Sequence, residues 1–180
     1  MGETINFDKK HALQLRDTLT LSEAFYTAFD STKVMRTIQD FLENRLDRLS
    51  YVGGGSHMDV WRFSVKHDLS YVLKISRDDL SVDLFRGLRA FKEARLTDLP
   101  LLPPFELIDF EGSFFFISLY GERPDHEMLP HWHPLAEVIT GTQEQLKKNG
   151  FFINDFIQIR LFKGIPFICD LSDLSLIPPK

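Results

Sequence analysis

Residues 51–74, YVGGGSHMDVWRFSVKHDLSYVLK, decide the fold that we expect for this chain. The stretch opens with three consecutive glycines, continues with alternating apolar residues over 60–65, turns at the polar residues 66–68 and returns as YVLK at 71–74. This pattern predicts a strand, a glycine-rich loop, a second strand, a turn and a third strand.

The glycine loop and Lys74 together suit the binding of a phosphate group. Only glycine lets the backbone turn tightly enough for several N–H groups to point at one anion, and a lysine on the neighbouring strand adds positive charge. A plain hairpin with a flexible corner and an exposed lysine is the alternative interpretation.

The spacing of these residues resembles the nucleotide-binding loop of protein kinases. Gly53, Gly55 and Val60 match the pattern G-x-G-x-x-G-x-V, with Met58 where the third glycine is usual, and the VLK at 72–74 resembles the kinase V-A-I-K strand. No lysine follows the glycines directly, so the loop is not a P-loop of the G-K-[ST] kind. The resemblance implies that ATP is held by Gly53, Gly54, Gly55, Ser56, Val60 and Lys74.

The following segments extend this resemblance. A helix is expected over 80–96 because Leu84, Leu88 and Phe91 form an apolar stripe, and the prolines of residues 100–104 end it. Strands are expected over 105–110 and 114–119. Together these elements give a five-stranded antiparallel sheet with one helix, the order of a kinase N-terminal lobe. The resemblance then places Leu119 and Tyr120 at the interlobe hinge, where backbone groups would bind an adenine edge.

Glu93 occupies the position of the kinase glutamate that pairs with the strand lysine. It lies nineteen positions after Lys74, about the distance found in the family. At 100° per residue, however, Glu93 falls roughly opposite Leu84 on the helix. An exposed Glu93 that pairs with Arg89 therefore remains open as an alternative.

Residues 149–173, NGFFINDFIQIRLFKGIPFICDLSD, resemble the catalytic and metal-binding end of a kinase. Strands are expected over 157–162 and 166–169, with a Lys163-Gly164 turn between them. Asp170-Leu171-Ser172 then resembles a degenerate D-F-G, so Asp170 is expected to ligate Mg²⁺. A turn aspartate at a strand end is the alternative.

The catalytic loop departs further from the kinase pattern. Counting back from Asp170 puts Gln158 at the position of the second metal ligand and Ile153 at that of the catalytic aspartate. Asp155 serves as the catalytic base only if the loop is two residues shorter, because a base must reach the substrate hydroxyl. Its alternative role is to cap the loop.

The complete expectation is an α+β protein with a protein-kinase-like two-lobe fold. Residues 1–48 form an N-terminal helical extension, 49–120 the N-lobe, and 121–180 a truncated helical C-lobe without activation loop or substrate platform. In the extension, Asp30 and Ser31 cap a helix whose apolar face we expect to pack on the N-lobe rather than to dock a partner. Residues 135–148 predict a further helix, ended by Asn149-Gly150.

The C-terminal sequence also resembles a narrower group. The residues from Ile165 to Asp170, IPFICD, and SLIP at 175–178 are similar to the ending of the PhoP regulatory network (YrbL-type) family of small bacterial kinase-like proteins. Small kinase-like effectors that bacterial pathogens inject into hosts resemble the same truncated plan. These likenesses imply a bacterial protein that works in the bacterial or the host cytosol.

Composition narrows the class of function. The net charge of −5 gives no basic surface for DNA or RNA. No apolar run approaches the ~20 residues that span a bilayer. The single cysteine, Cys169, excludes an intrachain disulfide.

Three functions follow from the resemblance. The first is a minimal kinase that binds ATP and Mg²⁺ through Lys74 and Asp170 and phosphorylates a protein Ser, Thr or Tyr. The second is a pseudokinase, a binding module that regulates a protein partner. The third and weakest is a small-molecule phosphotransferase, because GGGSHMDVW also resembles that branch. The sequence leaves the substrate, the partner and the oligomeric state open.

Overall fold

We describe the protein from a computed structural model. The structure describes residues 21–54, 58–65, 69–76, 81–96, 99, 101–124, 133–153, 158–171 and 174–177, with the backbone alone for 81–84 and 133–135.

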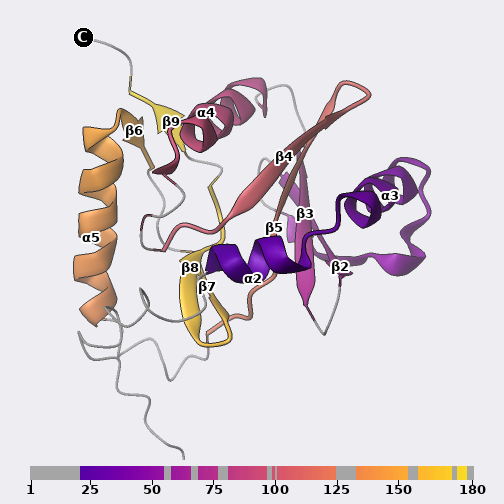
Figure 1. Ribbon diagram of the computed structural model, residues 1–180, viewed down its shortest axis with the longest axis horizontal. Helices are drawn as coiled ribbons and strands as arrows, with labels where there is room; N and C mark the ends of the chain where they lie inside the picture. Colours follow the sequence, from indigo (N-terminus) through magenta and orange to yellow (C-terminus); the bar gives the residue numbers. More distant parts are fainter. Residues whose placement is uncertain are drawn as a thin grey trace, which may run out of the picture.

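A five-stranded antiparallel sheet forms the centre of the fold (Figure 1). Its strands are β1 (Ser50–Gly54), β2 (Met58–Ser64), β3 (Ser70–Ser76), β4 (Phe105–Phe110) and β5 (Ser113–Leu119), in the order β1-β2-β3-β5-β4. Glu111 and Gly112, both with positive φ, make the tight turn between β4 and β5. The predicted α+β class and its five-stranded sheet are thereby confirmed.

Two N-terminal helices cover one side of the sheet, which we call the back face. They are α2 (Leu21–Ala28) and α3 (Ser31–Leu42), followed by the short 3-10 helix η1 (Leu46–Arg48). Phe25 is fully buried there, and the Tyr71 hydroxyl on β3 donates a 2.6 Å hydrogen bond to its carbonyl oxygen. Asp30 caps α3 by accepting from the backbone N–H of Lys33 at 3.0 Å. The part of this extension that the structure describes, from residue 21 on, packs on the sheet as expected.

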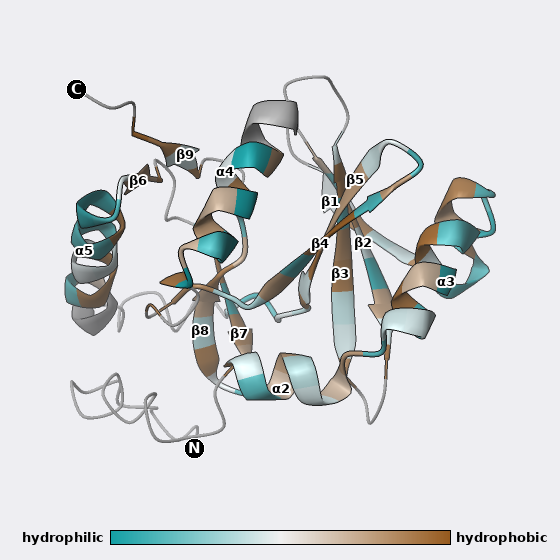
Figure 2. Cartoon of the chain, turned by 45° about the horizontal axis from the view of Figure 1, so that its top comes forward, coloured by the Kyte–Doolittle hydropathy of each residue, from teal (hydrophilic) through white to brown (hydrophobic). Residues whose placement is uncertain are grey.

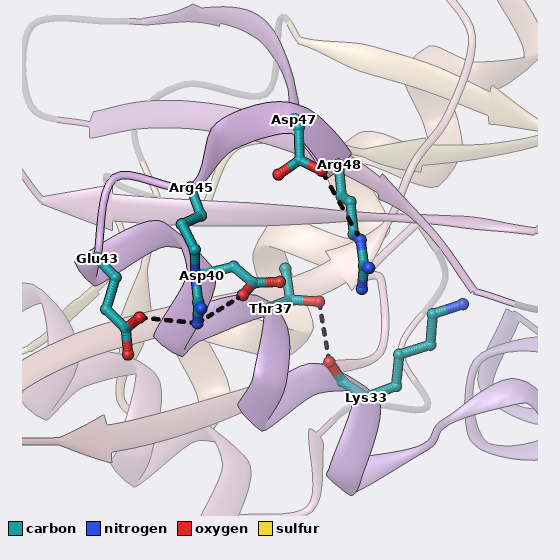
Figure 3. A network of polar contacts seen from close by, with 7 residues as sticks. All are labelled: Lys33, Thr37, Asp40, Glu43, Arg45, Asp47 and Arg48. Carbon is teal, nitrogen blue, oxygen red and sulfur yellow. Dashed lines mark hydrogen bonds and ion pairs between the residues drawn. The ribbon is translucent and has the colours of Figure 1, made fainter.

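The end of α3 and the residues after it carry a polar network (Figure 3). Arg45 pairs with Asp40 at 3.0 Å and with Glu43 at 2.8 Å, and Arg48 lies 4.0 Å from Asp47. Figure 2 shows hydrophilic residues on α3 next to a largely hydrophobic sheet. This amphipathic distribution explains why the helix lies at the surface of the molecule.

The opposite side of the sheet, the front face, packs against a second apolar core. Helix α4 (Ser81–Glu93) lies between β3 and β4 in sequence, and its Phe85, Leu88 and Phe91 are buried in this core. Helix α5 (His133–Lys148), ended by Gly150 with φ +82°, leads into β6 (Phe151–Phe152), which pairs with β9 (Ser175–Leu176). Neither β6 nor β9 is expected from the sequence pattern.

The hairpin of β7 (Ile159–Phe162) and β8 (Ile165–Ile168) connects to the sheet just after β5. Glu122 and Leu161 exchange two backbone hydrogen bonds, at 2.8 and 2.9 Å. Between them and the sheet, Gly121 allows a close approach: a Cβ there would lie 2.6 Å from the Phe167 ring and 2.7 Å from Arg160. The hairpin is thus held firmly against the end of β5.

Among the described residues, no helix is both long and apolar enough to cross a lipid bilayer.

Candidate functional site

Lys74 stands in a row of residues that runs across all five strands on the front face. Side chains alternate along a strand, so directly paired residues face the same side. Phe116 is one of the row's members that lie in the front core. From edge to edge the row is Gly53, Val60, Lys74, Phe116 and Leu107.

The Lys74 side chain is buried, and its ammonium group lies near three groups of the described residues. The residue is 7% exposed. Its Nζ donates to the carbonyl oxygen of Cys169, lies 3.9 Å from Asp170 Oδ1 and 5.5 Å from the centre of the Phe116 ring. A buried ammonium is costly unless it is paired, and here acceptors from the far end of the chain compensate it.

Gln158 lies opposite Cys169, the residue before Asp170, at the end of the β7–β8 hairpin. The backbone N–H of Cys169 donates to the Gln158 carbonyl at 2.8 Å, and Cys169 Sγ lies 3.7 Å from Gln158 Oε1. The Asp170 side chain is 31% exposed and that of Gln158 is exposed. Both offer oxygen ligands of the kind that Mg²⁺ prefers, so these residues fit the metal that the sequence implies. Within the described ranges, no group of three or more His, Cys, Asp or Glu is placed to hold a metal ion.

Cys169 links the lysine to this pair of residues through its backbone. Burial raises the pKa of its thiol, and the nearby Lys74 and Arg160 offset part of that rise. The thiol is therefore protonated at neutral pH. Sequence reasoning assigned no role to Cys169 or to Phe116; the strand alternation around Lys74 is the signal that places Phe116 beside it.

The glycine strand lies two strands away from Lys74 in register. Gly53 pairs with Val60, which pairs with Lys74. The φ of Gly53 is +152°, a conformation that residues with a Cβ rarely adopt, so glycine is required at this position. Gly54 is exposed. Gly55 and Ser56, predicted to cover the phosphates, lie outside the described residues, as does Asp155.

The structure does not bring Glu93 to Lys74. Glu93 is exposed at the last residue of α4, whereas Lys74 is buried and paired with Asp170. The prediction that Glu93 pairs with Lys74 is therefore wrong. The buried face of α4 carries Phe85 and Phe91, and the helical turn places Glu93 away from that face. Arg89, the alternative partner, lies over the Phe114 ring at 5.8 Å.

Lys92, on the last turn of α4, forms an ion pair that the sequence analysis did not predict. Its ammonium pairs with Glu106 of β4. Tyr26 of α2 also hydrogen-bonds Glu106; burial, the negative charge of that carboxylate and this bond raise the pKa of Tyr26 to about 12. An acidic residue within the apolar β4 sequence FELIDF was the available signal.

The predicted hinge residues are Leu119 and Tyr120. Leu119 is buried, and the backbone N–H of Tyr120 donates to the Ser70 carbonyl at 2.9 Å. That N–H is therefore engaged within the sheet in this structure. The adenine contacts of Leu119 and Tyr120 stay a prediction. The Tyr120 ring supports Arg62, whose guanidinium lies 4.1 Å from the ring centre.

The surface grooves lined by described residues include one on α3 and one between α5 and β6, and these two do not include Lys74 or Asp170. Their volumes are about 560 Å³ and about 230 Å³, respectively.

The sheet order β1-β2-β3-β5-β4, with α4 between β3 and β4 in the chain, is the order expected from the sequence. No protein-family model matches the chain. No curated protein matches it.

Two solved structures are similar to this chain. Amicoumacin kinase hAmiN, in complex with AMP-PNP, Ca²⁺ and Ami, is 11% identical with a TM-score of 0.38, over 83% of this chain and 66% of that one. APH(2")-IIa, in a ternary complex with streptomycin and ATP, is 15% identical with a TM-score of 0.41, over 83% of this chain and 74% of that one. The chain thus spans less than two thirds of the first of these proteins.

Proposed function

We propose that this chain binds ATP with Mg²⁺ on the front face of the sheet and acts as a phosphotransferase. One observation carries the proposal: Lys74 Nζ lies 3.9 Å from Asp170 Oδ1, although the two residues are 96 positions apart (170 − 74). A basic and an acidic group that meet in this way can together hold a phosphate and its cation.

The predicted site residues have separate tasks in this proposal. Lys74 turns from Asp170 to the nucleotide phosphates, and the β1 glycines supply backbone N–H groups. Asp170 and Gln158 would hold Mg²⁺, which when bound neutralises phosphate charge. The Phe116 ring beside Lys74 keeps water from one side of the ammonium. Asp155 is proposed to orient the acceptor hydroxyl, a protein Ser, Thr or Tyr.

A second candidate, nucleotide binding without transfer, is favoured by the position of Glu93. The kinase glutamate fixes the lysine for catalysis, and here the corresponding side chain is exposed. In that case the chain would be a regulatory binding module in the cytosol, divided at residues 48 and 120 as the sequence suggests.

Calorimetric titration with ATP and Mg²⁺ tests the binding step. Lys74→Met is expected to weaken binding about 100-fold, because removing one partner of a charged contact costs about 2–5 kcal/mol. Asp170→Asn should remove the dependence on Mg²⁺. Lys148→Met, the same substitution at an exposed lysine of α5, is the matched control and should bind like the wild type. No binding by the wild type would refute the proposal.

Incubation with labelled ATP separates the two candidates. Transfer of label to the chain or to a hydroxyl acceptor, lost in Asp155→Ala, supports the phosphotransferase. Binding without any transfer supports the module.

A further inference from the structure

The Asp170 carboxylate sits between two anchored parts of the chain. On one side, the Ile168 N–H donates to the Leu101 carbonyl at 2.7 Å, and Ile168 is fully buried. On the other, Leu171 and Leu174 are each 2% exposed in the same front core as Phe85 and Leu88 of α4. The position of Asp170 therefore depends partly on how Leu171 and Leu174 pack in the front core.

Leu174 and Ser175, a few residues after Asp170, pack closely on the backbone of α4. A Cβ placed on Gly87 would lie 2.9 Å from the carbonyl oxygen of Leu174 and 3.8 Å from the Ser175 Cα. The first distance is too short for real atoms, and the atom it meets is backbone, which cannot rotate away as a side chain does. Glycine is unfavourable in a helix interior by about 1 kcal/mol relative to alanine, so its presence at this point has a packing reason.

The same segment is fixed again further on. Strand β9 pairs with β6 through Phe152 and Ser175, and the Ile177 N–H donates to the Gly150 carbonyl at 2.8 Å. Figure 1 shows β9 next to α4, with β6 on its other side. The segment is thus held between α4 and β6.

From these contacts we infer that Gly87 is a positioning residue for Asp170: by admitting the Leu174 backbone against α4, it fixes the segment that aims the carboxylate at Lys74. The inference rests on the proposed nucleotide site for its functional meaning. The mechanical coupling between α4 and residue 170 is measurable without any nucleotide.

Cys169 provides that measurement, because it is the single cysteine of the chain and immediately precedes Asp170. In Gly87→Ala the Leu174 backbone must move, and the thiol opens to solvent more often. Cys169 is only partly exposed, so we expect about tenfold faster reaction with a neutral thiol reagent at fixed pH when the packing around it loosens and opens more often. The far-ultraviolet circular dichroism spectrum verifies that the variant is folded.

Gly141→Ala is the matched control. Gly141 also lies within a helix, α5, but a Cβ there would meet nothing within 4 Å. This variant should label at the wild-type rate. Ile177→Pro, which removes the hydrogen bond to Gly150 at an exposed position, loosens the same segment from its other end. It should give a smaller acceleration, about threefold, and it serves as the test if Gly87→Ala does not fold.

Wild-type labelling rates in Gly87→Ala, or in Ile177→Pro if the first variant is unfolded, would overturn the inference. A second arm uses calorimetry with ATP, with and without Mg²⁺. Gly87→Ala should lose about tenfold in the Mg²⁺-dependent affinity and keep the affinity for metal-free ATP, because a misplaced Asp170 affects the cation first. Equal loss with and without Mg²⁺ would contradict a positioning role. If the wild type binds no nucleotide, the proposed function fails, and the labelling rates still decide the coupling.

Discussion

The two faces of the sheet differ in what they bury. On the back face, Phe25 stacks on Tyr71 at 5.0 Å, and the polar group of Tyr71 is satisfied by a backbone carbonyl. On the front face, the same strand β3 buries the charged Lys74 beside the Phe116 ring and pairs it with a distant carboxylate. A buried ion pair is often no more stable than apolar residues of the same volume. The back face therefore serves stability, whereas the charge on the front face needs a functional explanation.

The largest expected effect is on the back face. Phe25→Ala removes a fully buried ring and should lower the free energy of unfolding by about 3–5 kcal/mol. Denaturant unfolding measures it. Phe152→Ala is the matched control, because that ring is 46% exposed, and it should change stability by about 0.5 kcal/mol or less. Similar losses in both variants would contradict the assignment of the back face.

Gly121→Ala should have the next largest effect on stability, because Gly121 lies where the β7–β8 hairpin contacts the end of the sheet. The added methyl meets Phe167 and the Arg160 Cβ, so the hairpin has to shift, at a cost of about 1–3 kcal/mol. Thermal unfolding measures this loss. Gly141→Ala, with open space around the new methyl, should instead stabilise by about 0.5–1 kcal/mol. A neutral Gly121→Ala would show that the hairpin is not tightly docked.

Tyr26→Phe should have the smallest effect and one confined to high pH. The pKa of Tyr26 rises from 10.0 in the unfolded chain to about 12 in the folded protein, so the folded state keeps the proton longer. Its stabilising contribution is complete below pH 10 and is lost as the pH rises towards 12. The pKa of Tyr71 is also raised by burial, in the same direction.

The free energy of unfolding in urea, measured below and above pH 10 for the wild type and Tyr26→Phe, tests this pH dependence. In Tyr26→Phe the loss of stability above pH 10 should be shallower than in the wild type, because the contribution of Tyr26 is removed while that of Tyr71 remains. If both proteins lose stability equally steeply, the pKa of Tyr26 does not change on folding.

The sequence predicted the elements whose signals are local. Alternating apolar residues and turn glycines defined the five strands, and Asp30 before Ser31 marked the start of α3. The approach of Lys74 to Asp170 followed from the kinase resemblance, not from any local pattern. The roles proposed for the individual site residues, and the finer resemblance to the YrbL-type family, stay predictions.

Other features needed long-range information. Strands β6 and β9 have two residues each, too few for any periodicity, and they pair across the length of the hairpin. Gly87 and Gly121 are required by close approach to segments far along the chain, which a lone glycine in a sequence does not reveal. Glu93 was assigned by spacing alone, and the turn of α4 places it at the surface.

The central claim is that Lys74 is buried on the front face for binding and not for stability. The most direct measurement is denaturant unfolding of the wild type and Lys74→Met, each with and without ATP and Mg²⁺. Without ligand, the two should agree within about 1 kcal/mol, because the Asp170 left behind is partly hydrated. With ligand at about 100 times its Kd, the wild type should gain about 2.7 kcal/mol and Lys74→Met almost nothing. A large loss of stability in unliganded Lys74→Met, with no gain from ATP and Mg²⁺ in the wild type, would show that the ion pair is a structural tether.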